Sequence, residues 1–307
     1  MNKYIIGIDG GGTKTLGVLF DQQGVELKRV EHGFSNFSVD LNEAKANIEL
    51  TISDLIRGLE KNRLLYIQMG IAGVSKLRDL KTYEQKLEDQ FQAGVSLDSD
   101  ALIALYSVKK NKDINVILVI GGTGSVLMIG EDQEVQIIGG FGHLLGDEGS
   151  AYHLVTSAFR KIIDEKESNQ QESDLSSKIL KQINATDYQQ IKNFVYNENK
   201  KTIANLSKFI ANQAENNDQD AIELFVQEGK FLATQTINAY QKIRNKQNVV
   251  IALRGGFLLS APYVKETLNK ELEIHLKNYQ VDTNPVEPVI GAYYLGFLKL
   301  SKRWEND

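Results

Sequence analysis

The fold of this chain is decided by residues 4–15, which read YIIGIDGGGTKT. An apolar run leads into Asp9, which is followed by three glycines and then by Thr13, Lys14 and Thr15. We interpret the run as a buried strand that brings a carboxylate to a turn whose backbone is not shielded by side chains. Consecutive glycines can take positive φ and point several N–H groups at one anion, to which the Lys and Thr side chains add a charge and donors. Because Asp9 would repel a phosphate unless a metal lay between them, the segment predicts a magnesium–nucleotide site.

Two well-known phosphate-binding loops resemble this segment, and neither fits it. In the Walker pattern four residues separate the first glycine from a Gly-Lys pair. Here four residues separate Gly7 from Gly12, but Thr13 then stands between Gly12 and Lys14. A dinucleotide-binding fingerprint needs a helix directly after the glycines. Here residues 16–20 are apolar and residues 21–24 form a polar turn, so we predict strand, turn and strand. A glycine-rich hairpin without a ligand is the alternative.

The same design returns at residues 115–129, NVILVIGGTGSVLMI. Both segments have an apolar run, a glycine turn with a threonine, and a second apolar run, so Thr13 and Thr123 occupy matching places. A polar hairpin and a third strand are predicted after each. We infer an internal duplication of one hairpin subdomain, so that two hairpins can grip one nucleotide. A third junction between a strand and glycines follows at residues 249–256, VVIALRGG.

The composition is that of a globular protein. The chain of 307 residues is 42% hydrophobic and 24% charged, and its length favours two domains with a cleft between them. The net charge of −5 and the lack of a basic block argue against nucleic acid as a partner. There is no cysteine, which excludes disulfides, thiolate metal sites, iron–sulfur ligation and a cysteine nucleophile. The N-terminal apolar run is short and is broken by Asp9, and no apolar stretch of the sequence reaches the length that spans a bilayer. These features predict a cytoplasmic protein without a membrane partner.

Several polar residues lie at junctions where they could bind a ligand or stabilise a turn. Asp98 and Asp100 follow a predicted strand and open a helix, and either could cap that helix through its side chain. Asn36 lies between aromatic residues, where capping its own turn and contacting a ligand are equally favoured. Residues 139–152 read GGFGHLLGDEGSAY. Their acidic side chains could do no more than accept the free N–H groups at the start of the helix that follows. For His143 a structural role is favoured.

The helical pattern and the two hairpins give the domain boundaries. Apolar residues recur with helical spacing in residues 41–61, 76–92, 151–247 and 289–302. We divide the chain into a first domain of residues 1–114 plus the C-terminal helix 288–307, and a second domain of residues 115–287 that contains the helical region 151–247.

Motifs along the chain resemble, in order, those of the BadF/BadG/BcrA/BcrD ATPases and the N-acetylglucosamine kinases, which belong to the actin, Hsp70 and sugar-kinase superfamily. They are residues 9–15, Asp100-Ala101, residues 122–125, residues 142–152, Gly255-Gly256 and residues 288–292. The resemblance covers nearly the whole chain. It implies an α/β fold of two duplicated RNase H-like domains of the actin-like ATPase type, with ATP in the cleft between them and a sugar deeper in the cleft. It also implies a homodimer.

The resemblance implies roles for individual residues as well. Asp100 matches the general base of the kinases, and Asp9 would hold Mg²⁺ through water. The two hairpins would hold the phosphates of ATP and the third glycine pair would lie against its adenosine; these residues are Gly11, Gly12, Thr13, Lys14, Thr15, Gly122, Thr123, Gly124, Ser125, Gly255 and Gly256. The sugar would be bound by Asn36, Gly73, Asp100, Gly142 and Asp147. The chain departs from the kinases at Phe141, where they usually have Trp, and at Val126, where some have Asn, which implies a different discrimination between hydroxyl patterns.

Together these features predict an enzyme that uses ATP and Mg²⁺ to phosphorylate a hydroxyl of an amino sugar, N-acetylglucosamine or N-acetylmuramic acid, in cell-wall amino sugar salvage. Asp100 is favoured over Asp98 as the base because Ala101 follows it, as in the family. Activators of acyl-CoA dehydratases, from the same family, need cluster-binding cysteines and are excluded, and the cysteine-rich zinc motif of the related ROK kinases is missing. The alternative is a sugar- and nucleotide-binding ATPase or sensor that acts on a protein partner.

Overall fold

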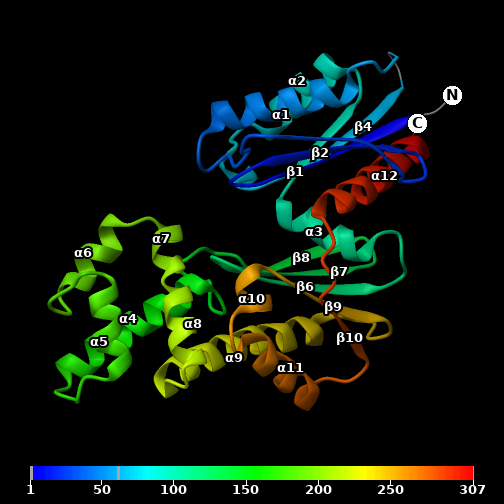
Figure 1. Cartoon of the computed structure of the whole chain (residues 1–307). Helices are drawn as coiled ribbons and strands as arrows, with labels where there is room; N and C mark the ends of the chain where they lie inside the picture. Colours follow the sequence, from blue (N-terminus) through cyan, green and yellow to red (C-terminus); the bar gives the residue numbers. More distant parts are fainter. Residues whose placement is uncertain (1–2, 61–62, 307) are drawn as a thin grey trace. The chain divides into compact units, whose positions relative to one another are not determined.

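The computed structural model describes residues 3–60 and 63–306 (Figure 1). The chain divides into two compact units. Unit 1 comprises Met1–Asp113 together with Asn284–Asp307, and unit 2 comprises Ile114–Thr283. Each unit is built on one five-stranded sheet.

The sheet of unit 1 combines an antiparallel meander with two parallel strands. Its strands are β1 (Tyr4–Gly10), β2 (Thr15–Asp21), β3 (Glu26–His32), β4 (Leu64–Ile71) and β5 (Gly94–Asp98). Their order across the sheet is β3-β2-β1-β4-β5. Tight hairpins join β1, β2 and β3 as antiparallel neighbours, while β4 and β5 run parallel to β1. Parallel neighbours need longer crossover connections, and helices supply them here.

Helices cover both faces of this sheet. They are α1 (Leu41–Ile56), α2 (Leu80–Phe91), α3 (Asp100–Lys109) and α12 (Pro288–Asn306), with a short 3-10 helix at Val74–Lys76. Ile6 and Ile8 of β1 pack in one apolar cluster with α1 and α2, whereas Ile5 packs in a second cluster with α12. This alternation follows from the period of two in a strand. Helix α12 also crosses α3 closely, since a Cβ at Gly291 would lie 1.8 Å from the carbonyl oxygen of Ile103.

The sheet of unit 2 repeats that of unit 1. Its strands are β6 (Asn115–Gly121), β7 (Ser125–Glu131), β8 (Glu134–Gly139), β9 (Val249–Arg254) and β10 (Tyr279–Asp282). From β8 the order is β8-β7-β6-β9-β10, with β6, β7 and β8 antiparallel and β9 and β10 parallel to β6. The hairpins also correspond, because Gly10 pairs with Thr15 in unit 1 and Gly121 pairs with Ser125 in unit 2. The duplication predicted from the sequence is confirmed.

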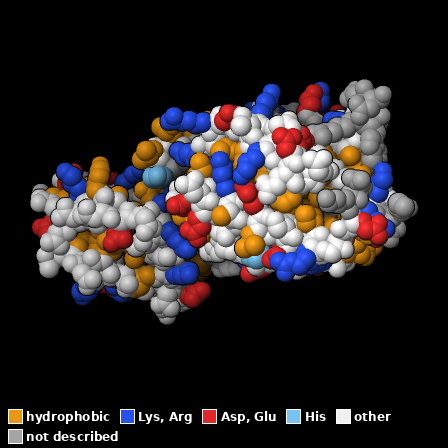
Figure 2. Space-filling view, turned by 90° about the horizontal axis from the view of Figure 1, so that it is seen from above, with side chains coloured by type: hydrophobic (Ala, Val, Ile, Leu, Met, Phe, Trp, Pro, Cys, Tyr) orange, Lys and Arg blue, Asp and Glu red, His pale blue; other side chains and the backbone are white. Residues whose placement is uncertain are grey.

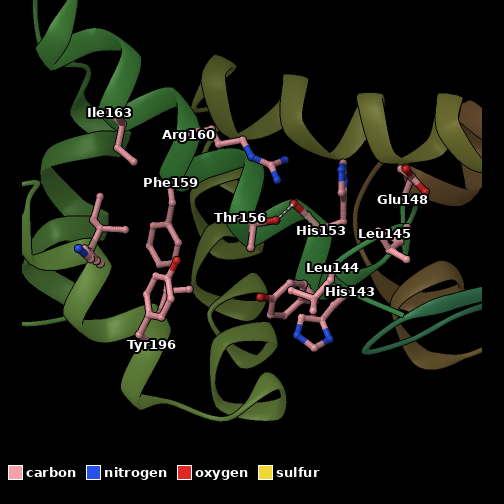
Figure 3. Close-up of a pocket in the computed structure, with 15 residues that line it drawn as sticks. His143, Leu144, Leu145, Glu148, His153, Thr156, Phe159, Arg160, Ile163 and Tyr196 are labelled. Atoms are coloured by element: carbon pink, nitrogen blue, oxygen red, sulfur yellow. Dashed lines mark hydrogen bonds between the residues drawn. The ribbon is translucent and has the colours of Figure 1, made fainter. Parts of the chain in front are cut away.

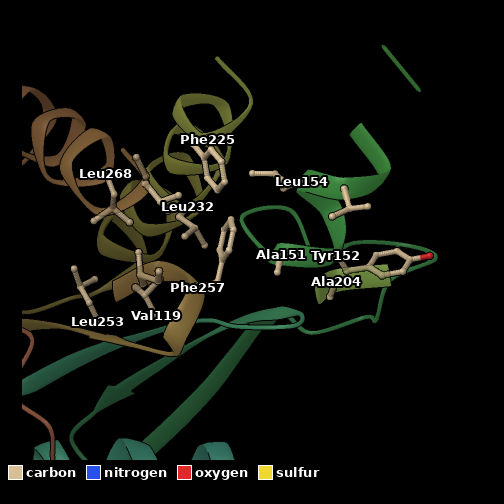
Figure 4. Close-up of a cluster of buried hydrophobic side chains, with 14 of the residues drawn as sticks. Val119, Ala151, Tyr152, Leu154, Ala204, Phe225, Leu232, Leu253, Phe257 and Leu268 are labelled. Carbon is tan, nitrogen blue, oxygen red and sulfur yellow. The ribbon is translucent and has the colours of Figure 1, made fainter. Parts of the chain in front are cut away.

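Eight helices belong to unit 2 in the described part of the chain. They are α4 (Ala151–Glu167), α5 (Asp174–Gln182), α6 (Gln190–Asn197), α7 (Lys200–Asn205), α8 (Ser207–Glu215), α9 (Gln219–Lys242), α10 (Gly256–Ser260) and α11 (Val264–His275). Helices α9 and α10 pack on the sheet, and α11 packs on α9. Their shared core includes Phe225 and Phe257, whose stacked rings lie 6.0 Å apart, with Leu232 and Val119 close by (Figure 4).

Two helices differ in extent from the sequence prediction. The helix predicted over residues 41–61 ends at Ile56, because Arg57 leaves the helical conformation and Gly58 takes a φ of +88°. The helix predicted over residues 76–92 begins only at Leu80, where the side chain of Asp79 accepts the N–H of Thr82 as an N-cap.

The surface carries charges of both signs. On the face shown in Figure 2, Lys and Arg side chains are interspersed with Asp and Glu side chains. None of the helices in the described residues combines the length and the apolar character needed to cross a bilayer.

Candidate functional site

The hairpin of unit 1 presents a bare turn. Its backbone is closed by the N–H of Gly11, which donates to the carbonyl oxygen of Lys14 at 3.0 Å. A Cβ at Gly12 would meet nothing nearer than the Nδ2 atom of Asn36 at 3.9 Å, and one at Gly11 would have similar space. By contrast, a Cβ at Gly10 would lie 2.2 Å from the Oγ atom of Ser35. The fold therefore requires glycine at position 10 but leaves the next two positions open, as close approach by a ligand would need.

The conformation of this turn differs from the prediction in one respect. Gly11 and Gly12 are not among the glycines with positive φ. The N–H groups are thus exposed by the missing side chains and not by left-handed residues.

The side chains that follow the glycines have unequal access to a ligand. Thr13 is exposed, and Lys14 is exposed and forms an ion pair with Glu31 at 2.7 Å. Thr15 is fully buried, and its hydroxyl donates to the carbonyl oxygen of Gly33 at 2.6 Å. In this conformation Thr15 fixes the base of the hairpin and its hydroxyl does not reach the open side.

Asp9 lies at the end of β1 in an unusual electrostatic environment. Burial and the negative charge of Asp100 raise its pKa from an ordinary 3.8 to about 6, although Lys14 acts in the opposite direction. Burial also raises the pKa of Asp100, even though its side chain keeps contact with solvent. Two neighbouring carboxylates with raised pKa values mark a place where a bound cation would be stabilising.

Replacing Asp9 by Asn is therefore expected to stabilise the ligand-free protein at pH 8. The folded state holds the Asp9 proton more tightly than the unfolded chain, so its ionisation costs stability only above the unfolded pKa. This cost is absent below about pH 4, grows between pH 4 and 6, and is complete above pH 6, where we expect about 1–2 kcal/mol after allowing for partial exposure. Urea unfolding at pH 4.5 and pH 8 with a metal chelator measures the difference. A variant less stable than the wild type at pH 8 would contradict this electrostatic environment.

The structure separates the two candidate bases. The carboxylate of Asp98 accepts hydrogen bonds from the Nζ atom of Lys299 at 2.6 Å and from the Nε2 atom of Gln68 at 2.8 Å. It therefore links α12 to the sheet. Asp100 is the first residue of α3, and its carboxylate accepts the N–H of Ala101 at 3.0 Å. Neither aspartate is the N-cap of this helix, since the hydroxyl of Ser99 accepts the N–H of Leu102 in that role. Asp100 is thus the carboxylate that remains accessible.

Asn36 and Gly73 lie together beside this hairpin. The Oδ1 atom of Asn36 accepts the N–H of Ser38 at 2.8 Å, which is the turn-capping role. The Nδ2 atom of the same side chain faces the space above Gly12. Gly73 has a φ of +72°, and a Cβ there would lie 2.7 Å from the Oδ1 atom of Asn36. Unit 1 therefore brings Asn36 and Gly73 beside the turn at Gly12, and it brings the charge of Asp100 near Asp9 at the end of β1. The Nδ2 end of Asn36 is left for a ligand.

The hairpin of unit 2 is built in the same way. The N–H of Gly122 donates to the carbonyl oxygen of Gly124 at 2.9 Å, and a Cβ at Gly122 would meet no atom closer than 4.0 Å. The hydroxyl of Ser125 donates to the carbonyl oxygen of Glu148 at 2.7 Å, which gives it the anchoring place that Thr15 has in unit 1. The N–H of Tyr152 donates to the carbonyl oxygen of Thr123, so α4 begins against this turn.

Asp147 lies beneath this second turn. It is 5% exposed and takes a φ of +70°. Its carboxylate accepts a hydrogen bond from the N–H of Ser125 at 3.3 Å and forms an ion pair with the Nζ atom of Lys200 at 2.6 Å. A Cβ at Gly124 would lie 2.7 Å from this carboxylate and 2.8 Å from the Lys200 nitrogen. Both carboxylate oxygens of Asp147 are engaged within the protein, and its partner Lys200 lies beside the turn at Gly124, although no sequence motif indicated this lysine.

A pocket of about 300 Å³ joins this turn to the third glycine junction. Its lining includes Gly122, Thr123 and Gly256 together with Asn205 and Lys208. A Cβ at Gly256 would meet nothing within 4 Å. Sequence reasoning missed the two polar residues because they come from α7 and α8, in a region whose only sequence signal is helical periodicity.

Gly255 and Gly142 both take positive φ values, which favour glycine. Gly255 has a φ of +97°, and a Cβ there would lie 2.4 Å from the carbonyl oxygen of Gly121. Gly142 has a φ of +80°, but a Cβ there would meet no atom within 4 Å. The first glycine therefore holds β9 and α10 against the hairpin, while the second leaves open space above its loop.

The carboxylates of unit 1 suit a hard cation. No group of three or more His, Cys, Asp or Glu side chains able to hold a metal ion occurs in residues 3–60 and 63–306. Mg²⁺ takes one or two carboxylates and completes its coordination with water and phosphate oxygens. Asp9 offers an oxygen ligand of this kind, and the negative charge of Asp100 nearby favours a cation there, so the place fits a Mg²⁺ ion that arrives with a nucleotide.

The fold and the two hairpins define a class of protein. Two mixed five-stranded sheets of this order, each with helices, match the two RNase H-like domains of sugar kinases with the actin-like fold. A structure from Chromobacterium violaceum, provisionally described as an N-acetylglucosamine kinase, superposes with a TM-score of 0.71 at 21% identity, over 96% of this chain and 99% of that one. This confirms the fold class predicted from the sequence.

The chain belongs to the BadF/BadG/BcrA/BcrD ATPase family, whose sequence profile matches residues 6–296. It is 26% identical over 304 residues to the N-acetylmuramic acid/N-acetylglucosamine kinase of Clostridium acetobutylicum, covering 94% of this chain and 97% of that protein. It is also 26% identical over 315 residues to the N-acetyl-D-glucosamine kinase of Dictyostelium discoideum, covering 96% and 98%. Use of ATP follows from membership of this family of ATPases and sugar kinases.

Proposed function

We propose that this chain transfers the γ-phosphoryl group of ATP to a hydroxyl of an amino sugar, N-acetylglucosamine or N-acetylmuramic acid. The observation that carries the proposal is the difference in contacts and accessibility between two neighbouring aspartates. Asp98 is engaged by Lys299 and Gln68, while Asp100 is left accessible near Asp9. The kinases named above as relatives support the choice of acceptor.

In this proposal Asp100 is the general base. Its carboxylate accepts the proton of the attacking sugar hydroxyl, the hydroxyl oxygen forms a bond to the γ-phosphorus, and the bond from that phosphorus to the bridging oxygen breaks to release ADP. A raised pKa makes Asp100 a stronger base than an ordinary carboxylate. Bound Mg²⁺ would neutralise charge on the phosphates, and Asp9 would hold it through water.

The remaining residues would bind and position the two substrates. The exposed backbones at Gly11, Gly12 and Gly122 would donate N–H groups to phosphate oxygens, with Lys14, Thr13 and Thr123 beside them. The pocket at Gly256 would take the nucleoside. Asn36 would donate its amide to a sugar hydroxyl, and Gly73 would keep that side chain in place. A homodimer in the cytoplasm completes the proposal.

The test is ADP release with ATP and Mg²⁺ against N-acetylglucosamine, N-acetylmuramic acid, glucosamine, N-acetylmannosamine and glucose, with a control that lacks sugar. Stimulation by one or both N-acetylated cell-wall sugars is expected. Equal ATP hydrolysis with and without every sugar would contradict the kinase and favour an ATPase or sensor that acts on a protein partner.

A further inference from the structure

The hairpin of unit 2 is bound in both directions to residues 148–151, the segment that leads into α4. The hydroxyl of Ser125 donates to the carbonyl oxygen of Glu148 at 2.7 Å. In return, the N–H of Ala151 donates to the carbonyl oxygen of Gly122 at 3.0 Å. A trans peptide group is planar, and its C=O and N–H point in opposite directions. Because the segment holds the carbonyl of Gly122, it also sets the direction of the N–H of Thr123, which belongs to the same peptide group.

This segment is held in turn by a buried carboxylate. The Oε2 atom of Glu228, on α9, accepts the N–H of Gly149 at 2.6 Å, and the side chain of Glu228 is only 1% exposed. The N–H of Gly149 and the carbonyl of Glu148 belong to one peptide group, and that carbonyl accepts the hydroxyl of Ser125. The peptide group is therefore held on one side by α9 and on the other side by the hairpin.

The second oxygen of Glu228 is engaged by the start of α4. Its Oε1 atom lies 2.8 Å from the Nδ1 atom of His153, in the first turn of that helix. A buried carboxylate is costly unless it is paired and hydrogen-bonded, and Glu228 has both kinds of partner. The side chain of His153 is 16% exposed and lines a pocket of about 660 Å³ (Figure 3). Glu228 thus holds both Gly149 and His153, and Ala151 lies between them in the chain.

Unit 1 contains the same arrangement with an uncharged side chain. The hydroxyl of Thr15 donates to the carbonyl oxygen of Gly33, and an N–H from the same loop donates to the carbonyl oxygen of Gly11 at 3.1 Å. The Nδ2 atom of Asn47, on α1, donates to the carbonyl oxygen of Phe34 in this loop at 2.8 Å. In each unit a helix side chain therefore holds the loop to which the hairpin is bound. This recurrence in a duplicated fold indicates that the contact serves the hairpin.

We propose that Glu228 is a positioning residue for the second hairpin, where it orients backbone N–H groups that bind a phosphate of ATP. It acts through the peptide group between Glu148 and Gly149 and does not touch the nucleotide. The inference rests on the nucleotide role that the proposed function gives this hairpin, and it extends that role to a helical region without a motif. What matters is an acceptor oxygen at the correct distance from Gly149, since Asn47 holds the corresponding loop of unit 1 without a charge.

Titration of ATP and Mg²⁺ without sugar tests the inference independently of turnover. Glu228→Leu leaves the N–H of Gly149 without its acceptor, and we expect it to lower ATP affinity about tenfold, because hydrogen bonds to phosphate depend on the direction of their donors. Glu228→Gln keeps an oxygen for Gly149 and turns its amide group to His153, so its affinity should stay within about twofold of the wild type. Wild-type affinity in Glu228→Leu, or an equal loss in Glu228→Gln, overturns the inference.

Glu228→Asp provides the same comparison with a smaller disturbance of the core, in case Glu228→Leu does not fold. It keeps the charge but withdraws the carboxylate by one methylene group, so its oxygen no longer reaches Gly149 while His153 keeps a partner. It is expected to bind ATP more weakly than Glu228→Gln. Equal affinity of these two variants overturns the inference.

A double-mutant cycle with Ser125→Ala tests the route from Glu228 to the hairpin. Ser125 holds the same peptide group from the other side, so the two substitutions release one unit. Each single variant should lose about tenfold in ATP affinity, and the double variant little more, whereas independent losses would multiply to about a hundredfold. A multiplicative loss overturns this route.

Tyr240→Phe is the matched control on the same helix. The hydroxyl of the buried Tyr240 donates to the carbonyl oxygen of Lys277, and Tyr240 lies about 18 Å along the axis of α9 from Glu228. Its loss should lower the melting temperature and leave ATP affinity unchanged. If Tyr240→Phe weakened ATP binding as much as Glu228→Leu, the effect of Glu228 would be one of general stability and the inference would fail.

A turnover assay with the sugars separates this inference from the proposed function. ATP affinity that depends on Glu228, without phosphorylation of any sugar, would refute the kinase and retain the positioning residue. Sugar phosphorylation with an ATP affinity that does not depend on Glu228 would retain the kinase and refute the positioning residue. Circular dichroism confirms that each variant is folded.

Discussion

Asp100→Asn is expected to lower sugar-dependent ADP release about a thousandfold. The amide keeps the size and the acceptor oxygen of the carboxylate but cannot take the proton of the sugar hydroxyl, and general-base catalysis contributes about 10²–10⁴-fold. Affinity for ATP should change little, because Asp100 lies at the start of α3 and not on the hairpin that would hold the phosphates. Single-turnover phosphorylation and nucleotide titration measure the two quantities separately.

Asp98→Asn provides the matched control for this prediction. It weakens the contacts with Lys299 and Gln68, so its expected effect is a loss of stability of about 1–2 kcal/mol with turnover largely kept. The opposite pattern, with full turnover in Asp100→Asn and none in Asp98→Asn, would make Asp98 the base. Full turnover in both variants would show that no carboxylate at this junction takes the proton.

Gly12→Val is expected to weaken ATP binding about a hundredfold without destabilising the fold. The new side chain would occupy space that the protein leaves empty, since the nearest atom is 3.9 Å from the added Cβ. It would keep phosphate oxygens from the backbone N–H groups, and each charge-assisted hydrogen bond lost costs about 1.5–3 kcal/mol. Gly12→Ala should show a smaller loss of affinity. Nucleotide titration and thermal unfolding measure the two effects.

Gly7→Ala, on the strand β1 that leads into the same hairpin, is the comparison. Its added Cβ would lie 2.8 Å from the carbonyl oxygen of Val289, so the expected effect is a lower melting temperature. If Gly12→Val also lowered the melting temperature and left ATP affinity unchanged, this hairpin would be structural and would not belong to the site.

Much of the fold could be predicted from local sequence signals. An apolar run, a glycine turn and a second apolar run occur twice, and the two sheets repeat the same strand order around them. The signal is reliable because strands and tight turns depend on residues close together in the chain. Helix ends were less predictable: the helix predicted to residue 61 ends at Ile56, where no sequence feature except Gly58 marks the change.

The roles of individual site residues depend on distant partners and could not be predicted in the same way. The junction itself left Asp98 and Asp100 as alternative bases, and only the resemblance to the family favoured Asp100. The contact that engages Asp98 comes from Lys299, which is 201 residues away in the chain. Thr15 looked like a phosphate ligand, but the carbonyl oxygen of Gly33 accepts its hydroxyl. Lys200 has no motif around it and reaches the second hairpin only because α7 begins beside Asp147. Such contacts are tertiary and leave no periodic or local signature.

The packing of α12 on the first sheet has a consequence for the growing chain on the ribosome. Strands β1 and β4 are made before unit 2, whereas α12, which covers their apolar face around Ile5 and Tyr66, is made after it. Unit 2 lies between them in a single stretch and can complete its core as it emerges. At about 5–20 residues per second, the uncovered face of unit 1 waits for about 10–45 s. The second half of the duplication thus matures before the first, and the early strands are the part of the nascent protein most exposed to aggregation and to chaperones.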